Sequence, residues 1–134
     1  MKNQLYRIHG DNIVECERTF EIILAATQTK AALIDSPAYK PIYNVCGNGY
    51  NFNIEMLPGH DRWGMSIGEN IISNGGILRE NADSYFSVIK NNKEHVLFAF
   101  EYCSALPAGN NAWQRNGRAL SSILANVPFF ILLN

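Results

Sequence analysis

The spacing of apolar side chains predicts a helix near the start of the chain. Residues 4–9 alternate between apolar and polar, which is typical of a short strand or an extended lead-in. Asn12 follows, and Glu15 stands three positions later, which is the spacing of a capping box at a helix N-terminus. From Ile13 onward apolar residues recur at helical intervals, so we expect a helix that extends to about residue 30.

Apolar and alternating runs later in the chain predict strands. Four are expected, at residues 42–46, 50–57, 82–89 and 95–103. The first two are joined by a Gly-Asn-Gly turn and the last two by a polar turn at 90–93, so each pair is predicted to form an antiparallel hairpin. The glycine-punctuated segment between the pairs, 58–76, predicts a long loop with at most one short helical turn.

The last third of the chain predicts one more helix and one more strand. Asn110 is placed to cap a helix that runs to about residue 125, and residues 128–133 form an apolar strand. The predicted order is therefore αββββαβ, which is an α/β (α+β) class of fold. We expect residues 1–134 to form a single domain, and the abrupt end after an apolar strand indicates either an N-terminal fragment or a subunit.

Composition excludes several classes of protein. With 47% hydrophobic and 17% charged residues, the chain is too apolar to be intrinsically disordered. The net charge of −1 excludes a histone-like protein, so any nucleic-acid binding must come from a local concentration of arginine. The longest apolar run, residues 127–133, is too short to cross a bilayer, and three widely spaced cysteines favour a reducing cytoplasm.

Two carboxylates are predicted to meet at one end of a hairpin. The turn at 90–93 brings Asp83, at the start of one strand, opposite Glu101, near the end of the next. Adjacent carboxylates repel each other, so such a pair persists mainly where a divalent cation or a shared proton stabilises it. The alternative is that Asp83 lies in a turn and that Glu101 forms an ion pair with Arg115 or Arg118.

The residues after Glu101 combine cations with amides. Positions 102–134 hold no acidic side chain. They carry instead a group of side chains that can contact phosphate: Asn110, Gln114, Arg115 and Arg118. Gln114 and Arg118 share one helical face, and guanidinium groups bind phosphate oxygens in a bidentate manner. These residues predict contact with a phosphodiester, and the alternative is an ordinary solvated helix face.

The long loop holds a second group of candidates. Asp61 and Arg62 stand between a histidine and a tryptophan. Arginine beside aromatic rings is a plausible contact set for nucleic acid, and Arg62 is the candidate contact. The alternative is a loop anchored by its tryptophan. Asp61 also competes with Asp83 for the role of a metal ligand.

With these residues in place, the chain resembles the PD-(D/E)xK nucleases. A helix with a glutamate is followed by strands that carry Asp83 and Glu101, and then by a helix and a strand. Segments 10–18 and 104–119 are similar to segments of bacterial type II restriction endonucleases. The resemblance implies a restriction-endonuclease-like core, in which a mixed central sheet is flanked by helices. It implies that Asp83 and Glu101 hold Mg²⁺, that Glu15 assists them, and that the substrate is double-stranded DNA.

The sequence departs from the pattern of that family at one position. The family's lysine follows the acid by two residues, where this chain has Cys103. Gln114 or Arg115 from the following helix would then take the lysine's catalytic role. Cutting both strands of DNA requires two active sites, hence a homodimer or a partner subunit.

Three functional hypotheses follow from the sequence. The first is a Mg²⁺-dependent, site-specific DNA endonuclease of the restriction type, which is a hydrolase. The second is a catalytically inactive nuclease-fold module for DNA binding or assembly in a restriction system. The third is an unrelated small α+β interaction domain.

Overall fold

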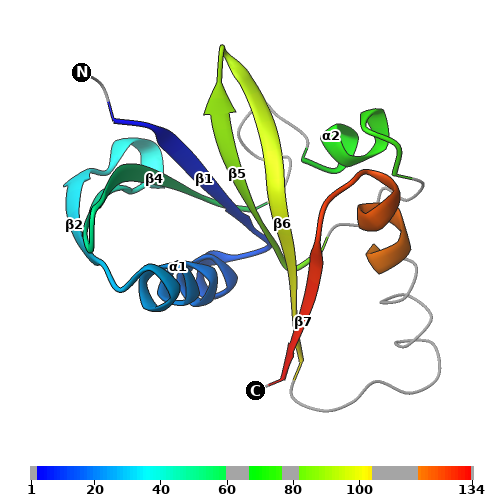
Figure 1. The fold of residues 1–134 in the computed structure, drawn as a ribbon, viewed down its shortest axis with the longest axis horizontal. Coiled ribbons are helices and arrows are strands. Elements are labelled where there is room, and N and C mark those ends of the chain that lie inside the picture. The colour runs from blue at the N-terminus through cyan, green and yellow to red at the C-terminus, as the bar shows by residue number, and fades with distance from the viewer. Residues whose placement is uncertain (1–2, 60–66, 77–81, 104–117, 134) are drawn as a thin grey trace.

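The fold is a mixed α+β arrangement built on one twisted sheet (Figure 1). The computed structural model describes residues 3–59, 67–76, 82–103 and 118–133. These residues include seven strands: β1 Leu5–Gly10, β2 Lys30–Asp35, β3 Ile42–Gly47, β4 Tyr50–Pro58, β5 Ser84–Lys90, β6 Lys93–Cys103 and β7 Phe129–Leu133. The strand order across the sheet is β2-β3-β4-β1-β5-β6-β7. Because β1 pairs in parallel with β4 and β6 with β7, while the other pairs are antiparallel, the sheet is mixed.

Helices lie on both faces of the sheet (Figure 1). The described helices are α1 Ile13–Thr27, the short 3₁₀ turn η1 Pro37–Tyr39, α2 Ile67–Ser73 and a helix at residues 118–124. Helix α1 packs against β1, β4 and β5 on one face. On the other face a second core contains Ile67 and Ile71 of α2, together with Ala125 and Val127, which follow helix 118–124.

Helix α1 begins as the sequence predicts. The side chain of Asn12 accepts a hydrogen bond from the backbone N–H of Glu15 at 3.1 Å, which confirms the predicted cap. The helix ends at Thr27 rather than near residue 30, because Gln28 adopts a left-handed conformation with φ of 54° and turns the chain into β2.

The predicted order αββββαβ is wrong at three points. Residues 5–10 form a full strand, β1, which lies in the middle of the sheet between β4 and β5. Residues 30–35 form the edge strand β2, which the prediction omitted. Residues 67–73 form helix α2, which has seven residues, in the segment that was predicted to be a long loop with at most one short helical turn.

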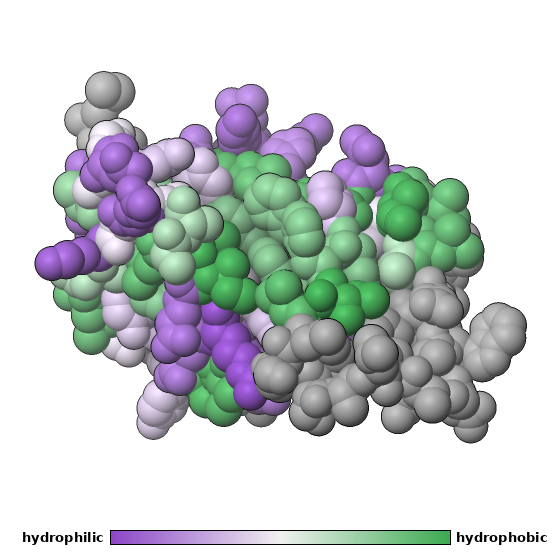
Figure 2. Space-filling model, turned by 60° about the horizontal axis from the view of Figure 1, so that its bottom comes forward, coloured by the Kyte–Doolittle hydropathy of each residue, from purple (hydrophilic) through white to green (hydrophobic). Residues whose placement is uncertain are grey.

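The edge strands are more apolar on their exposed sides than alternation predicts. Leu33 and Ile34 are both exposed on β2, as are Phe130 and Ile131 on β7. Figure 2 shows hydrophobic side chains gathered across the middle of one face of the molecule. Neither β2 nor β7 alternates regularly between apolar and polar residues. The alternation that identifies a strand in a sequence is therefore weak in β2.

The hairpin of β5 and β6 confirms the predicted antiparallel pairing. Ser84 pairs with Phe100 at the end of the hairpin where the candidate carboxylates lie, and the register shifts by one residue between Phe86 and Ser87. Of the helix predicted at 110–125, residues 118–124 are helical, and residues 110–117 lie outside the described part of the chain. None of the described helices is long and apolar enough to cross a membrane.

Candidate functional site

Several segments meet at one end of the central sheet (Figure 1). Strand β1 ends at Gly10, beside the start of β5 and the end of β4. The backbone N–H of Asp11 donates to the carbonyl of Asp83 at 2.9 Å, and that of Gly59 donates to the carbonyl of Gly10 at 2.7 Å. The N-terminus of α1 follows directly, so the side chains of its first turn project near the same end of the sheet.

Asp83 is held by the strand on which Glu101 lies. Its Oδ2 accepts a hydrogen bond from the backbone N–H of Tyr102 at 2.7 Å. Asp83 and Glu101 each stand one residue beyond the Ser84–Phe100 pair. The juxtaposition of these two residues at one end of the hairpin therefore agrees with the register predicted from the turn.

Glu101 is buried and paired with a guanidinium group. The residue is 3% exposed, and its Oε1 accepts a hydrogen bond from Nη1 of Arg118 at 2.7 Å. Arg118 is the first described residue of the helical segment 118–124, which leads back to β7. This contact is the ion pair that the sequence offered as the alternative for Glu101, and it supplies the positive charge that a buried carboxylate needs.

Glu15 faces a negatively charged environment at the start of α1. Burial raises the pKa of its carboxyl, and the negative charges of Asp83 and Asp11 raise it further, while Arg18 lowers it. Its Oε2 is buried and has no hydrogen-bond partner among the described residues. Glu15 and Asp83 are thus close enough to repel each other, and a cation between them would relieve that repulsion.

A hydroxyl cluster supports this end of the sheet, and sequence reasoning missed it. Thr19 Oγ1 lies 2.6 Å from the hydroxyl of Tyr102 and forms a short hydrogen bond with Ser84. The guanidinium of Arg18 lies over the Tyr102 ring, 5.6 Å from its centroid. Burial raises the pKa of Tyr102. The only indication in the sequence was a threonine on the apolar face of a predicted helix.

A second polar cluster lies on the face of the sheet away from α1. Glu94 accepts from Arg7 at 3.3 Å and contacts His9 Nε2 at 2.5 Å, and Ser87 also donates to it. Arg7 bonds Glu55 at 3.0 Å in addition. Burial alone would raise the pKa of Glu94, but the hydrogen bonds from His9 and Ser87 and the charges of His9 and Arg7 lower it to about 2. The sequence did not reveal this cluster either.

The remaining predicted site residues lie outside the described part of the chain. They are Asp61, Arg62, Asn110, Gln114 and Arg115. Within the described ranges, no three His, Cys, Asp or Glu side chains are grouped so that they could hold a metal ion by themselves.

Comparison with protein-family models, curated proteins and solved structures gives no match to this chain.

Proposed function

We propose that the protein is a Mg²⁺-dependent endonuclease of the restriction type, which hydrolyses phosphodiester bonds of double-stranded DNA. In this proposal α1, β5, β6, helix 118–124 and β7 form a restriction-endonuclease-like core. The observation that carries the proposal is that acidic residues meet at one end of the sheet. Asp83 and Glu101 each stand one residue beyond the Ser84–Phe100 pair, and the charge of Asp83 adds to burial in raising the pKa of Glu15. Acidic groups held together at the end of a sheet favour a bound cation.

The proposed carboxylate ligands suit Mg²⁺ better than a metal ion that takes all of its ligands from protein side chains. Mg²⁺ commonly takes one or two carboxylates and fills its other positions with water and phosphate oxygens. Glu15 offers a buried carboxylate oxygen without a hydrogen-bond partner among the described residues, and Asp83 offers a second carboxylate. Glu101 would complete the set from the neighbouring strand. A site that needs substrate phosphate to be complete is compatible with the lack of a three-residue cluster among the described side chains.

The chain's own groups orient the proposed ligands. The backbone N–H of Tyr102 fixes one oxygen of Asp83, and Arg118 fixes one oxygen of Glu101. Arg118 is partly exposed, so it is placed to contact a phosphate as well as Glu101. Mg²⁺, when bound, would neutralise charge on the phosphodiester during hydrolysis. Gln114 and Arg115 are proposed to supply the polar group that stands in for the family's lysine.

A second candidate function is a nuclease-fold module that binds DNA or assembles a restriction system without cutting. The Glu101–Arg118 ion pair favours it, because the protein itself already supplies a cation to the more buried of the two strand carboxylates. For the catalytic proposal, two active sites are needed to cut both strands, so we propose a homodimer or a complex with a partner subunit in the cytoplasm.

The test is to titrate Mg²⁺ while the melting temperature and the cleavage of supercoiled plasmid DNA are measured in parallel. Wild type should gain stability, by about 2.7 kcal/mol at a Mg²⁺ concentration of 100 times Kd, and should nick or cut the plasmid. Asp83→Asn and Glu15→Gln should lose both effects. Glu69→Gln removes an exposed carboxylate of α2 and is the matched control, which should behave like wild type.

Each result separates the candidates. Stabilisation by Mg²⁺ that depends on Asp83, without any cleavage, favours the inactive module. If Mg²⁺ stabilises wild type and Asp83→Asn equally, Asp83 is not a metal ligand and the catalytic proposal fails.

A further inference from the structure

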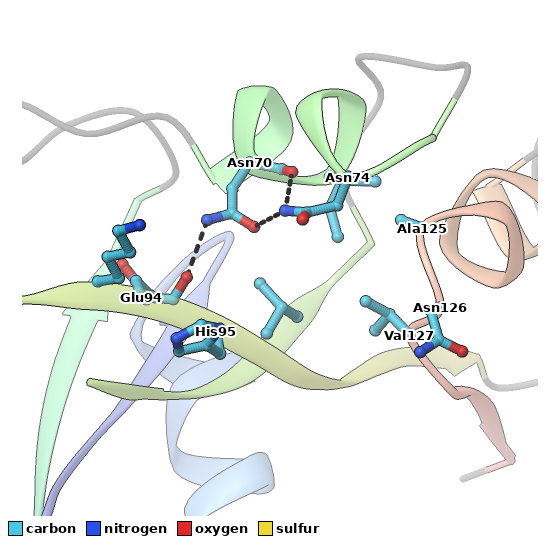
Figure 3. A pocket seen from close by; sticks show the side chains of 10 residues that line it. Asn70, Asn74, Glu94, His95, Ala125, Asn126 and Val127 are labelled. Atoms are coloured by element: carbon cyan, nitrogen blue, oxygen red, sulfur yellow. Dashed lines mark hydrogen bonds between the residues drawn. The ribbon is translucent and has the colours of Figure 1, made fainter. Parts of the chain in front are cut away.

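A cavity of about 680 Å³ lies beside the first half of β6, away from the carboxylates (Figure 3). Its walls are α2 on one side and residues 125–127 on the other. It exists because β7 pairs with β6 only from Ala99 onward, which leaves the earlier part of β6 open along this edge. The volume falls within the range of about 300–1,000 Å³ that is usual for ligand pockets.

The walls of the cavity are fixed by close contacts. Asn70 of α2 donates from Nδ2 to the carbonyl of Glu94 at 3.2 Å, as Figure 3 shows. At the end of α2 the chain approaches helix 118–124 so closely that a Cβ on Gly75 would lie 2.6 Å from the carbonyl oxygen of Leu124. A Cβ on Gly76 would lie 2.7 Å from Ser121 Oγ. The cavity is therefore a built feature rather than a gap between loosely joined elements.

Lys93 brings a formal positive charge to the lining of the cavity. Lys93 and His95 both line it, both are exposed, and neither makes an ion pair with another described residue. Glu94, which lies between them in the sequence, also lines the cavity, but its carboxylate is bound to Arg7, His9 and Ser87. A ligand with an anionic group would therefore meet an ammonium group and an imidazole without a competing carboxylate from Glu94.

The rest of the lining combines amides with an apolar floor. Val96 of β6 forms apolar surface between the two walls, and Ile71 and Val127 add apolar side chains from the walls themselves. Asn74 donates from Nδ2 to Asn70, which leaves its Oδ1 as an acceptor, and Asn126 lines the other wall with an exposed side chain. Amide side chains read the edges of nucleobases, and a flat ring packs against apolar surface. A ligand that has a phosphate group and a flat ring with a hydrogen-bonding edge is a nucleotide.

The position relative to the carboxylates favours a nucleotide that is part of a DNA strand. Glu94 and Glu101 are seven residues apart on β6, which corresponds to roughly 20 Å along a strand. The cavity and the Glu101–Arg118 pair are both bordered by elements on the face of the sheet away from α1. A duplex rises about 3.4 Å for each base pair, so about six base pairs would reach from the cavity to the Glu101–Arg118 pair.

We propose that this cavity is a second DNA contact, which binds a backbone phosphate through Lys93 and His95 and a nucleobase edge through Asn74 and Asn126. The choice of DNA over a free nucleotide rests on the proposed function. This contact strengthens the binding of DNA and fixes the position of the DNA along the protein. It takes no part in the hydrolysis itself.

The experiment measures binding of a fluorescent 16-base-pair duplex in EDTA, so that cleavage does not interfere. Lys93→Gln should weaken binding and should lower the slope of log affinity against log salt concentration by about 1. Lys90→Gln is the matched control, because Lys90 is the exposed partner of Lys93 across the same hairpin and does not line the cavity. Asn126→Gly removes the amide but tolerates the left-handed backbone at this position, where φ is 62°, and should also weaken binding.

A second measurement locates the ligand directly. The duplex should shift the methyl resonances of Ile71 and Val96 in wild type and not in Lys93→Gln, while that of Ile8 on the α1 face stays unchanged. Equal weakening by Lys93→Gln and Lys90→Gln would show a diffuse charge effect and overturn the proposal. Shifts with deoxyadenosine monophosphate but none with the duplex would overturn the assignment to DNA.

This test and that of the proposed function can fail independently. If duplex binding depends on Lys93 and no Mg²⁺-dependent cleavage is seen, the second DNA contact is supported and the endonuclease proposal is contradicted. If the protein cleaves DNA and Lys93→Gln leaves both the duplex affinity and KM unchanged, the endonuclease proposal is supported and the second DNA contact is contradicted.

Discussion

Glu101 and Arg118 form a buried ion pair that joins the end of β6 to the helix that leads back to β7. Oε1 of Glu101 lies 2.7 Å from Nη1 of Arg118, and the two side chains are 4% and 23% exposed. A charge buried to this degree is costly unless it is paired, so each partner depends on the other. The pair therefore holds the described segment of this helix, 118–124, against the end of β6.

Removal of one partner is expected to cost more than removal of both. Arg118→Met should lower the free energy of unfolding by roughly 2–4 kcal/mol, because it leaves the carboxylate of Glu101 buried without the guanidinium. The double variant Glu101→Leu with Arg118→Met should recover much of that loss, since no buried charge remains. Urea unfolding at pH 7 measures both. Additive losses in the double variant would show that the two side chains are not energetically coupled.

Glu94 is expected to make the protein sensitive to acid. Its pKa is lowered from 4.5 to about 2, so the folded state favours the ionised carboxylate. This contribution is complete above pH 4.5 and is lost as the pH falls from there towards 2. Because one pKa unit corresponds to about 1.4 kcal/mol, the contribution amounts to about 3 kcal/mol.

The matched variant for this prediction is Glu94→Gln, which keeps the shape of the side chain but cannot ionise. It should be less stable than wild type at pH 7, and the difference between the two proteins should shrink between pH 4.5 and 2. Chemical unfolding at a series of pH values gives both curves. Two curves that stay parallel over this interval would contradict the role assigned to Glu94.

The features that the sequence predicts correctly depend on local spacing. The cap at Asn12 and the register that brings Asp83 opposite Glu101 both follow from residues that are close in the chain or joined by one turn. Each is fixed by geometry that a few residues carry: a side chain that reaches the third N–H of a helix, and a hairpin that pairs outward from its turn.

The features that it misses depend on distant pairing. Strand β1 is central because it pairs in parallel with β4, some 48 positions later, and no local pattern reports such a partner. His9 and Glu94 are 85 positions apart, and each looks like an ordinary polar residue of a strand until β1, β5 and β6 are placed side by side. The cavity beside β6 exists only because β7 pairs with half of that strand.

Gly75, in a described segment, is expected to be a glycine at which substitution damages the fold directly. Its φ is +113°, and an added Cβ would lie 2.6 Å from the backbone carbonyl oxygen of Leu124, which cannot move without helix 118–124. Gly49 separates the two effects, because its φ is +84° but a Cβ there would meet nothing within 4 Å. Gly49→Ala should cost about 1 kcal/mol for the backbone conformation alone.

Gly75→Ala should cost more than Gly49→Ala, by about 1–3 kcal/mol, since the contact with Leu124 is added to the same conformational penalty. Thermal unfolding of the two variants measures the difference. Because the contact joins α2 to helix 118–124, Gly75→Ala should also shift the methyl resonances of Ile71 and Val127, which line the cavity on opposite walls, whereas Gly49→Ala should leave them in place. Equal losses of stability in the two variants would mean that the approach of α2 to helix 118–124 is looser than the structure describes.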